Sequence, residues 1–377
     1  MRTTRPRDIP LHRPHRLLRS ACFLFLVGVL VGCPSCPSSL IIDDDDAVAD
    51  DDDAADDDDA VADDDDAADD DDAAPAPDAC GDGDIDLYEG VPSPCGDGPE
   101  EEIETLGGLL AWAAAPGSDA VVVEAVAAAG ADIAVETECG FRTLMGASIT
   151  GLNSLTLAAD TIDLRGDVSA AGAVVLRAAV QAQSRTSSAL EAATLEIEAP
   201  VIDQRGDTAV TDRLCLEGGD VLVRMVANNA VVGADVLVAG SAVDVRADFI
   251  GASEVRYTST GDLISRQPSR LEDVPLVEVE AAAALDLHGD FHEIDQLSLS
   301  AGEFTCRADS TLDASGLVSV SATNLILNCT VVGNDEVSIG TVTYTTSRST
   351  DLSGNTVCSL SGVHESGPVP AGCPTTP

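Results

Sequence analysis

The sequence predicts an all-β fold, a single-stranded parallel β-helix (β-solenoid) with about 20 residues per coil. Three observations predict it. Short stretches of alternating apolar and polar residues recur at a constant step along the chain. The Asn-Gly and Asp-Gly pairs typical of two-residue hairpin turns do not occur between residues 151 and 346, which favours parallel over antiparallel pairing. Finally, 45% of the 377 residues are hydrophobic but only 3% are aromatic, so Val, Leu, Ile and Ala must build the core.

Ten copies of an apolar-x-apolar pattern define the expected coils. Each copy is followed by another apolar residue around the eighth position, and the step between copies is 19 to 22 residues. The copies begin at Leu155, Val174, Leu195, Leu214, Val236, Val255, Val277, Leu297, Val318 and Val337. Residues in the same phase of successive coils should stack into an interior ladder with a spacing of about 4.8 Å.

The segment EEEIETLGGLLAWAAA, from Glu100 to Ala115, predicts a capping helix with acidic residues in its first turn. Its only tryptophan, Trp112, is expected to cover one end of the core. This helix, the Val121-Val122-Val123 run after it and the coil periodicity resemble right-handed parallel β-helix proteins of the pectin-lyase-like and filamentous-haemagglutinin-like kinds. The resemblance covers about residues 105–350. We expect a β-helix domain with its capping helix at residues 100–350, followed by a Cys- and Pro-containing tail at 351–377.

Residues 1–32 have the features of a signal peptide for export. The first 20 residues contain six arginines, and the apolar run that follows, residues 21–32, is shorter than the roughly 20 residues of a membrane-spanning helix. The run ends in Leu30-Val31-Gly32-Cys33, which resembles a bacterial lipobox. The resemblance implies cleavage before Cys33, acylation of this cysteine and, because Pro34 follows it, an outer-membrane location. The alternative is a plain signal peptide with a chance cysteine.

Residues 33–79 are expected to form a disordered, lipid-anchored linker. Aspartate accounts for 20 of the 30 residues from 43 to 72, and such a density of like charge opposes compaction. A solvated spacer is one interpretation of the linker, and loose calcium buffering is another. The whole chain has a formal charge of -48 and contains no lysine, which excludes nucleic-acid binding through a basic surface.

Residues 80–99 form a small segment in which Cys-Gly-Asp-Gly occurs at Cys80 and again at Cys95. Asp82, Asp84 and Asp86 alternate as in a calcium loop, with Glu89 close behind. Leu87 stands where an EF-hand loop has its turn glycine, and Ser93 where it has its bidentate glutamate. A calcium site and a Cys80–Cys95 disulfide with exposed acids therefore both remain open.

An outward stripe of acid–arginine pairs is expected on the coils. Because residues two apart on a strand share a face, each aspartate should point outward with the arginine that follows it. The pairs are Asp163 with Arg165, Asp203 with Arg205, and Asp244 with Arg246. One interpretation is a surface ladder of mutually compensating charges. The other follows from the resemblance to β-helix polysaccharide lyases, which implies acidic calcium ligands and an arginine base on such a face.

Two arginines of the stripe belong to Arg-Gly-Asp tripeptides, at residues 165–167 and 205–207. Equivalent coil positions read Arg-Ala-Asp or His-Gly-Asp, so a recurring turn explains all copies, whereas integrin recognition explains two. The body also contains cysteines suited to disulfides in an exported protein. Cys306 and Cys329 fall in neighbouring coils, and Cys358 and Cys373 could close the tail over the last coil, although sequence leaves the connectivity open.

These features together predict a surface-displayed, lipid-anchored lipoprotein of the bacterial cell envelope with a non-catalytic structural, adhesive or scaffolding solenoid. Its partners would be the membrane, through the lipid, and a surface glycan or another cell-surface protein, and no cofactor beyond calcium is expected. The rival hypothesis is a calcium-dependent carbohydrate-active enzyme, a lyase or hydrolase. The uniform coil length argues against the rival, because a catalytic cleft needs long loops to form its walls.

Overall fold

The computed structural model describes residues 101–114, 121–127, 130–225, 229–352, 357–370, 373 and 375–376. Every described residue belongs to one compact unit within Asp72–Pro377. The signal peptide, the acidic linker and the segment 80–99 lie outside the described residues. So do the predicted site residues Cys33, Cys80, Asp82, Asp84, Asp86, Glu89 and Cys95.

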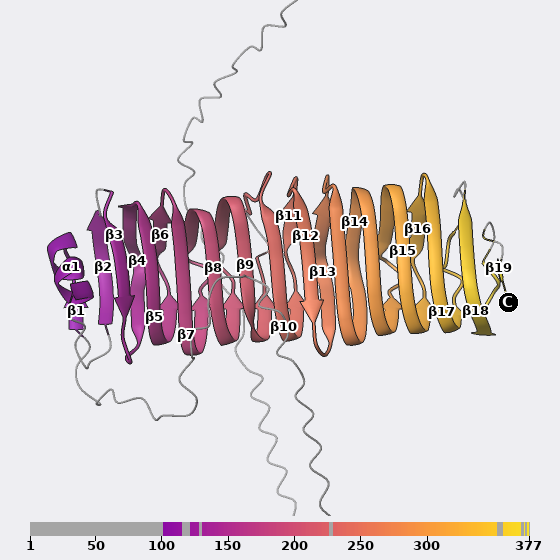
Figure 1. Ribbon diagram of the computed structural model, residues 1–377, viewed down its shortest axis with the longest axis horizontal. Helices are drawn as coiled ribbons and strands as arrows, with labels where there is room; N and C mark the ends of the chain where they lie inside the picture. Colours follow the sequence, from indigo (N-terminus) through magenta and orange to yellow (C-terminus); the bar gives the residue numbers. More distant parts are fainter. Residues whose placement is uncertain are drawn as a thin grey trace, which may run out of the picture. The chain divides into compact units, whose positions relative to one another are not determined.

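The described residues form one short helix and nineteen strands, stacked along a single axis (Figure 1). The helix is α1 (Leu106–Ala114). In chain order the strands are β1 (Glu101–Ile103), β2 (Val121–Ala127), β3 (Asp132–Glu136), β4 (Phe141–Leu152), β5 (Ser154–Leu164), β6 (Asp167–Ala170), β7 (Ala173–Ser184), β8 (Ala189–Gln204), β9 (Asp207–Val223), β10 (Asp235–Val245), β11 (Asp248–Ile250), β12 (Glu254–Ser259), β13 (Leu263–Glu272), β14 (Leu276–Cys306), β15 (Thr311–Leu327), β16 (Thr330–Gly333), β17 (Glu336–Thr346), β18 (Cys358–Ser366) and β19 (Thr375–Thr376).

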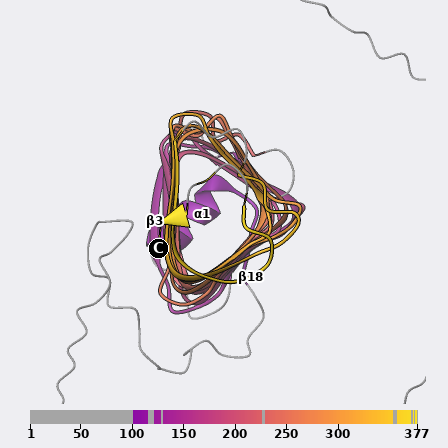
Figure 2. The same cartoon turned by 90° about the vertical axis from the view of Figure 1, so that its right-hand side faces the viewer.

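The strands confirm the predicted parallel β-solenoid. Leu155 pairs with Val174, and Val174 pairs with Leu195, as the 20-residue repeat requires. The same stacking continues through Leu214 and Val236. All ten predicted coil starts are at most 4% exposed. Figure 2, seen along the axis, shows the coils superposed around a closed, roughly triangular outline.

Helix α1 caps the first coil, but it is shorter than the sequence predicted. Glu101–Ile103 forms strand β1 instead, in which buried Ile103 pairs with Val123. The helix begins only after Thr105, whose hydroxyl accepts a hydrogen bond from the Gly108 N–H at 3.1 Å. The acidic residues are therefore not in its first turn. Trp112 is buried, with its ring centre 5.8 Å from that of Phe141 in β4.

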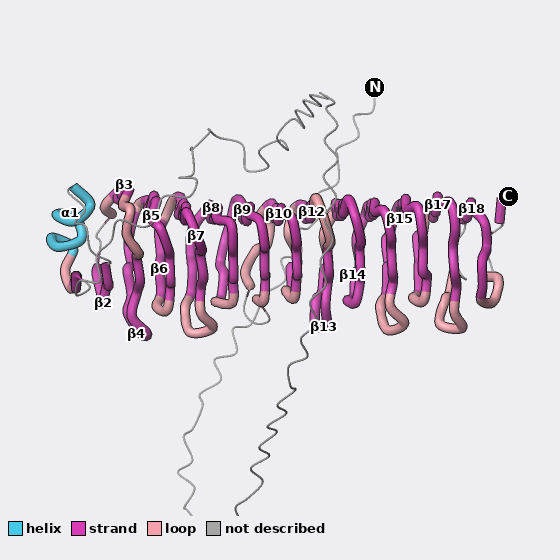
Figure 3. The backbone as a smooth tube through the Cα atoms, turned by 90° about the horizontal axis from the view of Figure 1, so that it is seen from below, coloured by secondary structure: helices cyan, strands magenta, loops and turns pink. Residues whose placement is uncertain are grey.

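At the other end the stacking continues into the range expected to be a tail. Val337 in β17 pairs with Cys358 in β18, and Ile339 pairs with Leu360. Both β18 residues are buried, so β18 adds a strand to the core after residue 350. Figure 3 shows β18 as the continuation of the row of coils, with α1 at the opposite end.

Candidate functional site

The aspartates of the predicted Asp–Arg stripe lie in one column, that is, at positions that pair with one another from coil to coil along the solenoid. The register places one residue of each successive coil in this column. The residues are, in order, Asp163, Gln183, Asp203, Leu222, Asp244, Ile264 and Asp286. Every second coil therefore contributes an aspartate, and successive carboxylates are separated by two coil spacings, about 9.6 Å. This alternation limits repulsion between like charges.

Asp163 bonds to arginines from two coils. Its carboxylate lies 2.6 Å from Nη2 of Arg165, two residues along the same chain segment. Its other oxygen accepts a hydrogen bond at 3.0 Å from Nε of Arg185, in the next coil. The Asp163 side chain is only 14% exposed, so both arginines help to compensate a charge that is largely removed from water.

Asp203 and Asp244 have similar surroundings. Both oxygens of Asp203 accept hydrogen bonds from Nε of Arg205, at 2.8 and 2.9 Å, and Asp203 is 93% buried. The hydrogen bond to Asp203 raises the pKa of the Arg205 guanidinium above its ordinary value. Asp244 lies 3.7 Å from Arg246 in its own coil and 3.0 Å from Arg266 in the next.

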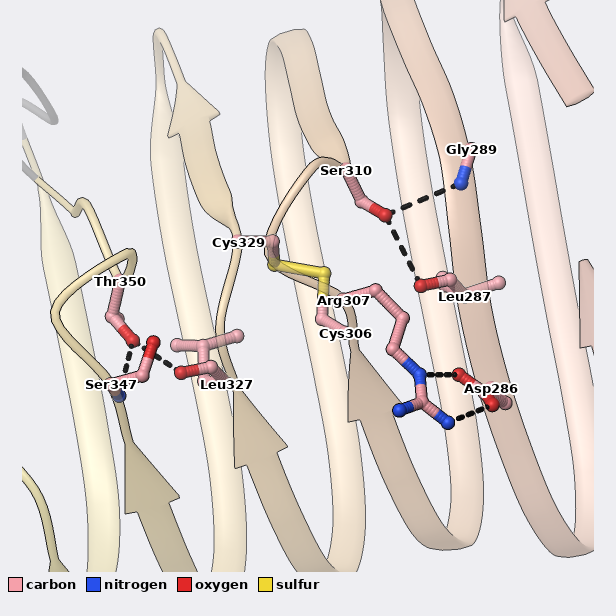
Figure 4. The surroundings of a disulfide bond; sticks show 10 residues. All are labelled: Asp286, Leu287, Gly289, Cys306, Arg307, Ser310, Leu327, Cys329, Ser347 and Thr350. Atoms are coloured by element: carbon pink, nitrogen blue, oxygen red, sulfur yellow. Dashed lines mark hydrogen bonds and ion pairs between the residues drawn. A yellow bond between two sulfur atoms is a disulfide. The ribbon is translucent and has the colours of Figure 1, made fainter. Parts of the chain in front are cut away.

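The arginines from neighbouring coils are the part of this site that the sequence prediction missed. Arg185, Arg266 and Arg307 each lie one coil after the aspartate that they bond. Arg185 and Arg307 directly follow the ends of β7 and β14, whereas Arg266 lies within β13, where the register shifts between Ser265 and Ser269. Figure 4 shows the last of these pairs, in which Nε and Nη2 of Arg307 donate to the two oxygens of Asp286 at 2.7 and 2.5 Å. The sequence does contain a signal for these arginines, because arginine or histidine recurs at the same phase of successive coils.

These contacts determine what the stripe can do chemically. Each of the aspartates is engaged by at least one guanidinium, so a calcium ion would have to displace an arginine to bind there. The arginines, in turn, are held as charged donors by their carboxylates. Among the described residues, no group of three or more His, Cys, Asp or Glu side chains is placed to hold a metal ion.

The two Arg-Gly-Asp tripeptides form corners whose backbone is capped by the previous coil. The hydroxyl of Thr143 accepts hydrogen bonds from the N–H groups of Arg165 and Gly166, at 2.9 and 3.0 Å. Ser184 does the same for Arg205 and Gly206, at 3.2 and 3.1 Å. These hydrogen bonds support the turn interpretation, because the N–H groups of the arginine and the glycine at each corner bond to the coil before it.

Close approach of the coils, rather than a left-handed backbone, explains the corner glycine. A Cβ atom on Gly206 would lie 2.3 Å from Oγ and 2.6 Å from the carbonyl oxygen of Ser188, and Gly206 does not have a positive φ. We expect Gly206→Ala to lower the free energy of unfolding by about 1–3 kcal/mol, because backbone of the neighbouring coil must move. Denaturant unfolding measures this change. Gly340→Ala is the control, since its Cβ would meet nothing closer than 3.9 Å, and an equal loss in both variants would contradict the explanation.

Two disulfides join the cysteine pairs that spacing had singled out. Cys306 and Cys329 are bonded across neighbouring coils, with 5.6 Å between their Cα atoms (Figure 4). Cys358, the first residue of β18, is bonded to Cys373, with 4.9 Å between Cα atoms. Cys139 and Cys215 also take part in disulfides, which the sequence had not assigned.

The last coils present an uncharged face, here called the serine face. It consists of two adjacent columns of outward residues on the first strand of each coil. One column is Ser298, Ser319, Ser338 and Ser359, and the other is Ser300, Ser321, Gly340 and Ser361. The side chains are exposed or half-buried, so seven hydroxyl groups form a regular array about 4.8 Å apart along the axis. The body around it is acidic, which makes this neutral array distinctive.

A pocket of about 320 Å³ lies near the first coils, where Asn153, Ser169 and Glu191 supply side-chain polar atoms among small residues. Glu191 is the one charged residue lining it, so the pocket does not contain the pair of carboxylates that most glycoside hydrolases use. The charged side chains of the Asp–Arg stripe, by contrast, bond one another.

No helix in the described part of the chain has the length and apolar character needed to span a membrane. Comparison with known proteins adds no relative: no protein-family model matches the sequence, and neither a curated protein nor a solved structure matches it significantly. The structure shows the fold, a parallel β-solenoid with Asp–Arg pairs along its coils.

Proposed function

We propose that the chain is a lipid-anchored, non-catalytic rod of the bacterial cell surface that acts as a structural or adhesive scaffold. Acylated Cys33 would hold it to the outer membrane, and the polyaspartate linker would separate the rod from the lipid. The observation that carries the non-catalytic part is the pairing within the stripe. Asp163, Asp203 and Asp244 each bond arginine from their own coil, and two of them also bond arginine from the next.

The adhesive part of the proposal rests on the serine face. A strongly acidic rod repels acidic surfaces, because like charges meet across the gap. An uncharged array of hydroxyls avoids this repulsion and can donate and accept hydrogen bonds. A neutral, hydroxyl-rich glycan is the partner that fits this chemistry, and its repeating units would meet repeating serines.

Two assays on the purified mature chain test the proposal. The first incubates it with polygalacturonate and alginate, with and without calcium, and we expect no cleavage. Calcium-dependent cleavage that is lost in Asp203→Ala would overturn the non-catalytic part in favour of the carbohydrate-active alternative.

The second assay measures retention of the chain on immobilised neutral polysaccharides. We expect retention that falls at least several-fold when Ser319→Asp and Ser338→Asp place carboxylates in the middle of the serine face. Thr156→Asp is the matched control, since Thr156 occupies the equivalent outward strand position in an early coil. If the serine-face variants were retained as well as the wild type, an adhesive role for this face would be contradicted and a purely structural rod would remain.

A further inference from the structure

Two cysteines of the solenoid form disulfides whose partners are not among the other described cysteines. Cys139 and Cys215 are both disulfide-bonded. The remaining four cysteines in the described part of the chain bond one another, as Cys306–Cys329 and Cys358–Cys373.

Cys139 and Cys215 are too far apart to bond each other. Ala134 belongs to the same coil as Cys139, and four pairing steps lead from Ala134 to Cys215. At about 4.8 Å per step, these coils are about 19 Å apart along the axis. The two Cα atoms of a disulfide lie within about 7 Å of each other. Each cysteine is therefore bonded to a part of the chain outside the described residues.

The burial of Cys215 indicates that its partner approaches from outside the coils. Cys215 lies between Leu214 and Leu216, which point into the core, so its side chain points outward. It is nevertheless 0% exposed. The other residues of its outward column are exposed or half-buried: Ala134, Thr156, Val175, Glu196, Leu237, Arg256 and Glu278. A disulfide partner lying over this one position accounts for the difference.

The cysteine count narrows the candidates to three. The elimination rests on the proposed function, in which Cys22 leaves with the signal peptide and the thiol of Cys33 is acylated. Cys36, Cys80 and Cys95 remain for the two solenoid cysteines. Cys80 and Cys95 share the tetrapeptide Cys-Gly-Asp-Gly, which indicates a common role, whereas Cys36 lies seven residues before the polyaspartate run. The acidic body opposes the approach of that run.

The reach of the backbone places Cys95 beside Cys139. Cys95 precedes Glu101 by six residues, which span at most about 22 Å when fully extended. Two pairing steps, about 10 Å, lead from Glu101 to Phe141, and Cys139 is two residues before Phe141. Cys139 is therefore well within the reach of Cys95.

Cys215 lies beyond the reach of Cys95. Six pairing steps, about 29 Å, lead from Glu101 to Val221 in β9. Cys215 is six residues earlier in the same coil, so it lies about 27 Å from Glu101 along the axis and is also displaced sideways. The extended chain and a disulfide of about 6 Å together cover about 28 Å. The axial distance uses almost all of this reach, and the sideways displacement exceeds it.

We propose that Cys95 is bonded to Cys139 and Cys80 to Cys215, so that the segment 80–95 is a covalent strap on the outside of the solenoid. Its 15 residue steps span up to about 50 Å, more than enough for the roughly 19 Å between the two coils. Each bond forms when two thiols pass two protons and two electrons to a disulfide-donating oxidant of the cell envelope, which is reduced to a dithiol.

The strap changes where the linker is joined to the rod. Through Cys80, the chain that precedes the strap is covalently attached to β9, in addition to its backbone connection to β1. If the chain is anchored by lipid, as proposed above, tension from the membrane is carried by a coil within the stack. Strand β1 and helix α1 at the end of the stack are then protected from being pulled away first.

A disulfide map of the mature chain, purified with its free thiols alkylated, tests the proposal. Digestion without reductant by proteases specific for Arg, Glu and Asp places each of the three candidate cysteines in a separate peptide. We expect mass spectrometry to show peptide 78–81 linked to 214–217, and peptide 90–96 linked to 139–142. Exchanged partners, a link between 78–81 and 90–96, or a link from 33–42 to either solenoid peptide would overturn the proposal.

The same digest separates this proposal from the lipid anchor. A peptide 33–42 without lipid, together with the two expected links, would contradict the anchor and leave the strap in place. Cys80→Ala provides a second readout, since peptide 214–217 should then be alkylated by iodoacetamide in the unfolded chain without reduction. Cys36→Ala is the matched control and should leave that peptide unlabelled. An unlabelled peptide in Cys80→Ala, or a labelled one in Cys36→Ala, would also overturn the strap.

Discussion

Val318→Asp is expected to abolish folding of the coils around β15, with a loss of more than about 4 kcal/mol in the free energy of unfolding. Val318 is fully buried and lies in the interior ladder between Leu297 and Val337. A carboxylate at this position would have apolar neighbours above and below and no cation to pair with, so it could not recover its lost hydration. Circular dichroism during thermal unfolding, together with limited proteolysis, measures the effect.

The adjacent residue provides the control for this substitution. Ser319 precedes Val320 on the same strand and points outward, so Ser319→Asp adds the same charge in water. We expect its midpoint to stay close to that of the wild type. If Val318→Asp unfolded no more readily than Ser319→Asp, the assignment of inward and outward residues in β15 would be wrong.

Cys33→Ala is expected to abolish acylation and the processing that depends on it. Since the lipid is attached through the cysteine thiol, the variant should incorporate no labelled palmitate and should accumulate as the precursor that retains residues 1–32. Incorporation of labelled palmitate and intact mass of the protein from membrane fractions measure both effects.

Cys36 offers a matched control, because it lies three residues after Cys33. Cys36→Ala should be acylated and processed like the wild type. A Cys33→Ala chain that still carries lipid, or that is processed to the wild-type mass, would contradict the anchor assignment and favour a plain signal peptide.

The coil repeat could be predicted from the sequence because the interior is apolar and each strand alternates. Leu155, Val174 and Leu195 are recognisable one by one, and the constant step then implies that they stack. The first turn of the expected helix could not be predicted in this way. Glu101–Ile103 has acidic residues that favour a helix N-terminus, but its pairing with β2 outweighs that local preference.

The Asp–Arg stripe was predictable only in part, for a geometric reason. A pair such as Asp163 and Arg165 is two residues apart on one strand, so the alternation of side chains is enough to bring them together. The bond from Asp163 to Arg185 spans 22 residues and depends on the register between coils. Coil lengths stay within 19 to 22 residues, but a difference of one residue already changes which side chains are neighbours. Spacing alone therefore does not give that register, and the backbone pairing of β5 with β7 is needed to place the second arginine.

The Cys306–Cys329 disulfide has a mechanical consequence. In a solenoid pulled along its axis, the hydrogen bonds between coils run parallel to the load, so tension peels one coil after another from the end of the stack. This covalent link closes a separation of 23 residues, slightly more than one coil. When peeling from the C-terminus reaches residue 329, tension passes through the disulfide to Cys306. The residues between the two sulfurs cannot be pulled out, so the disulfide limits how far the rod can stretch under tension.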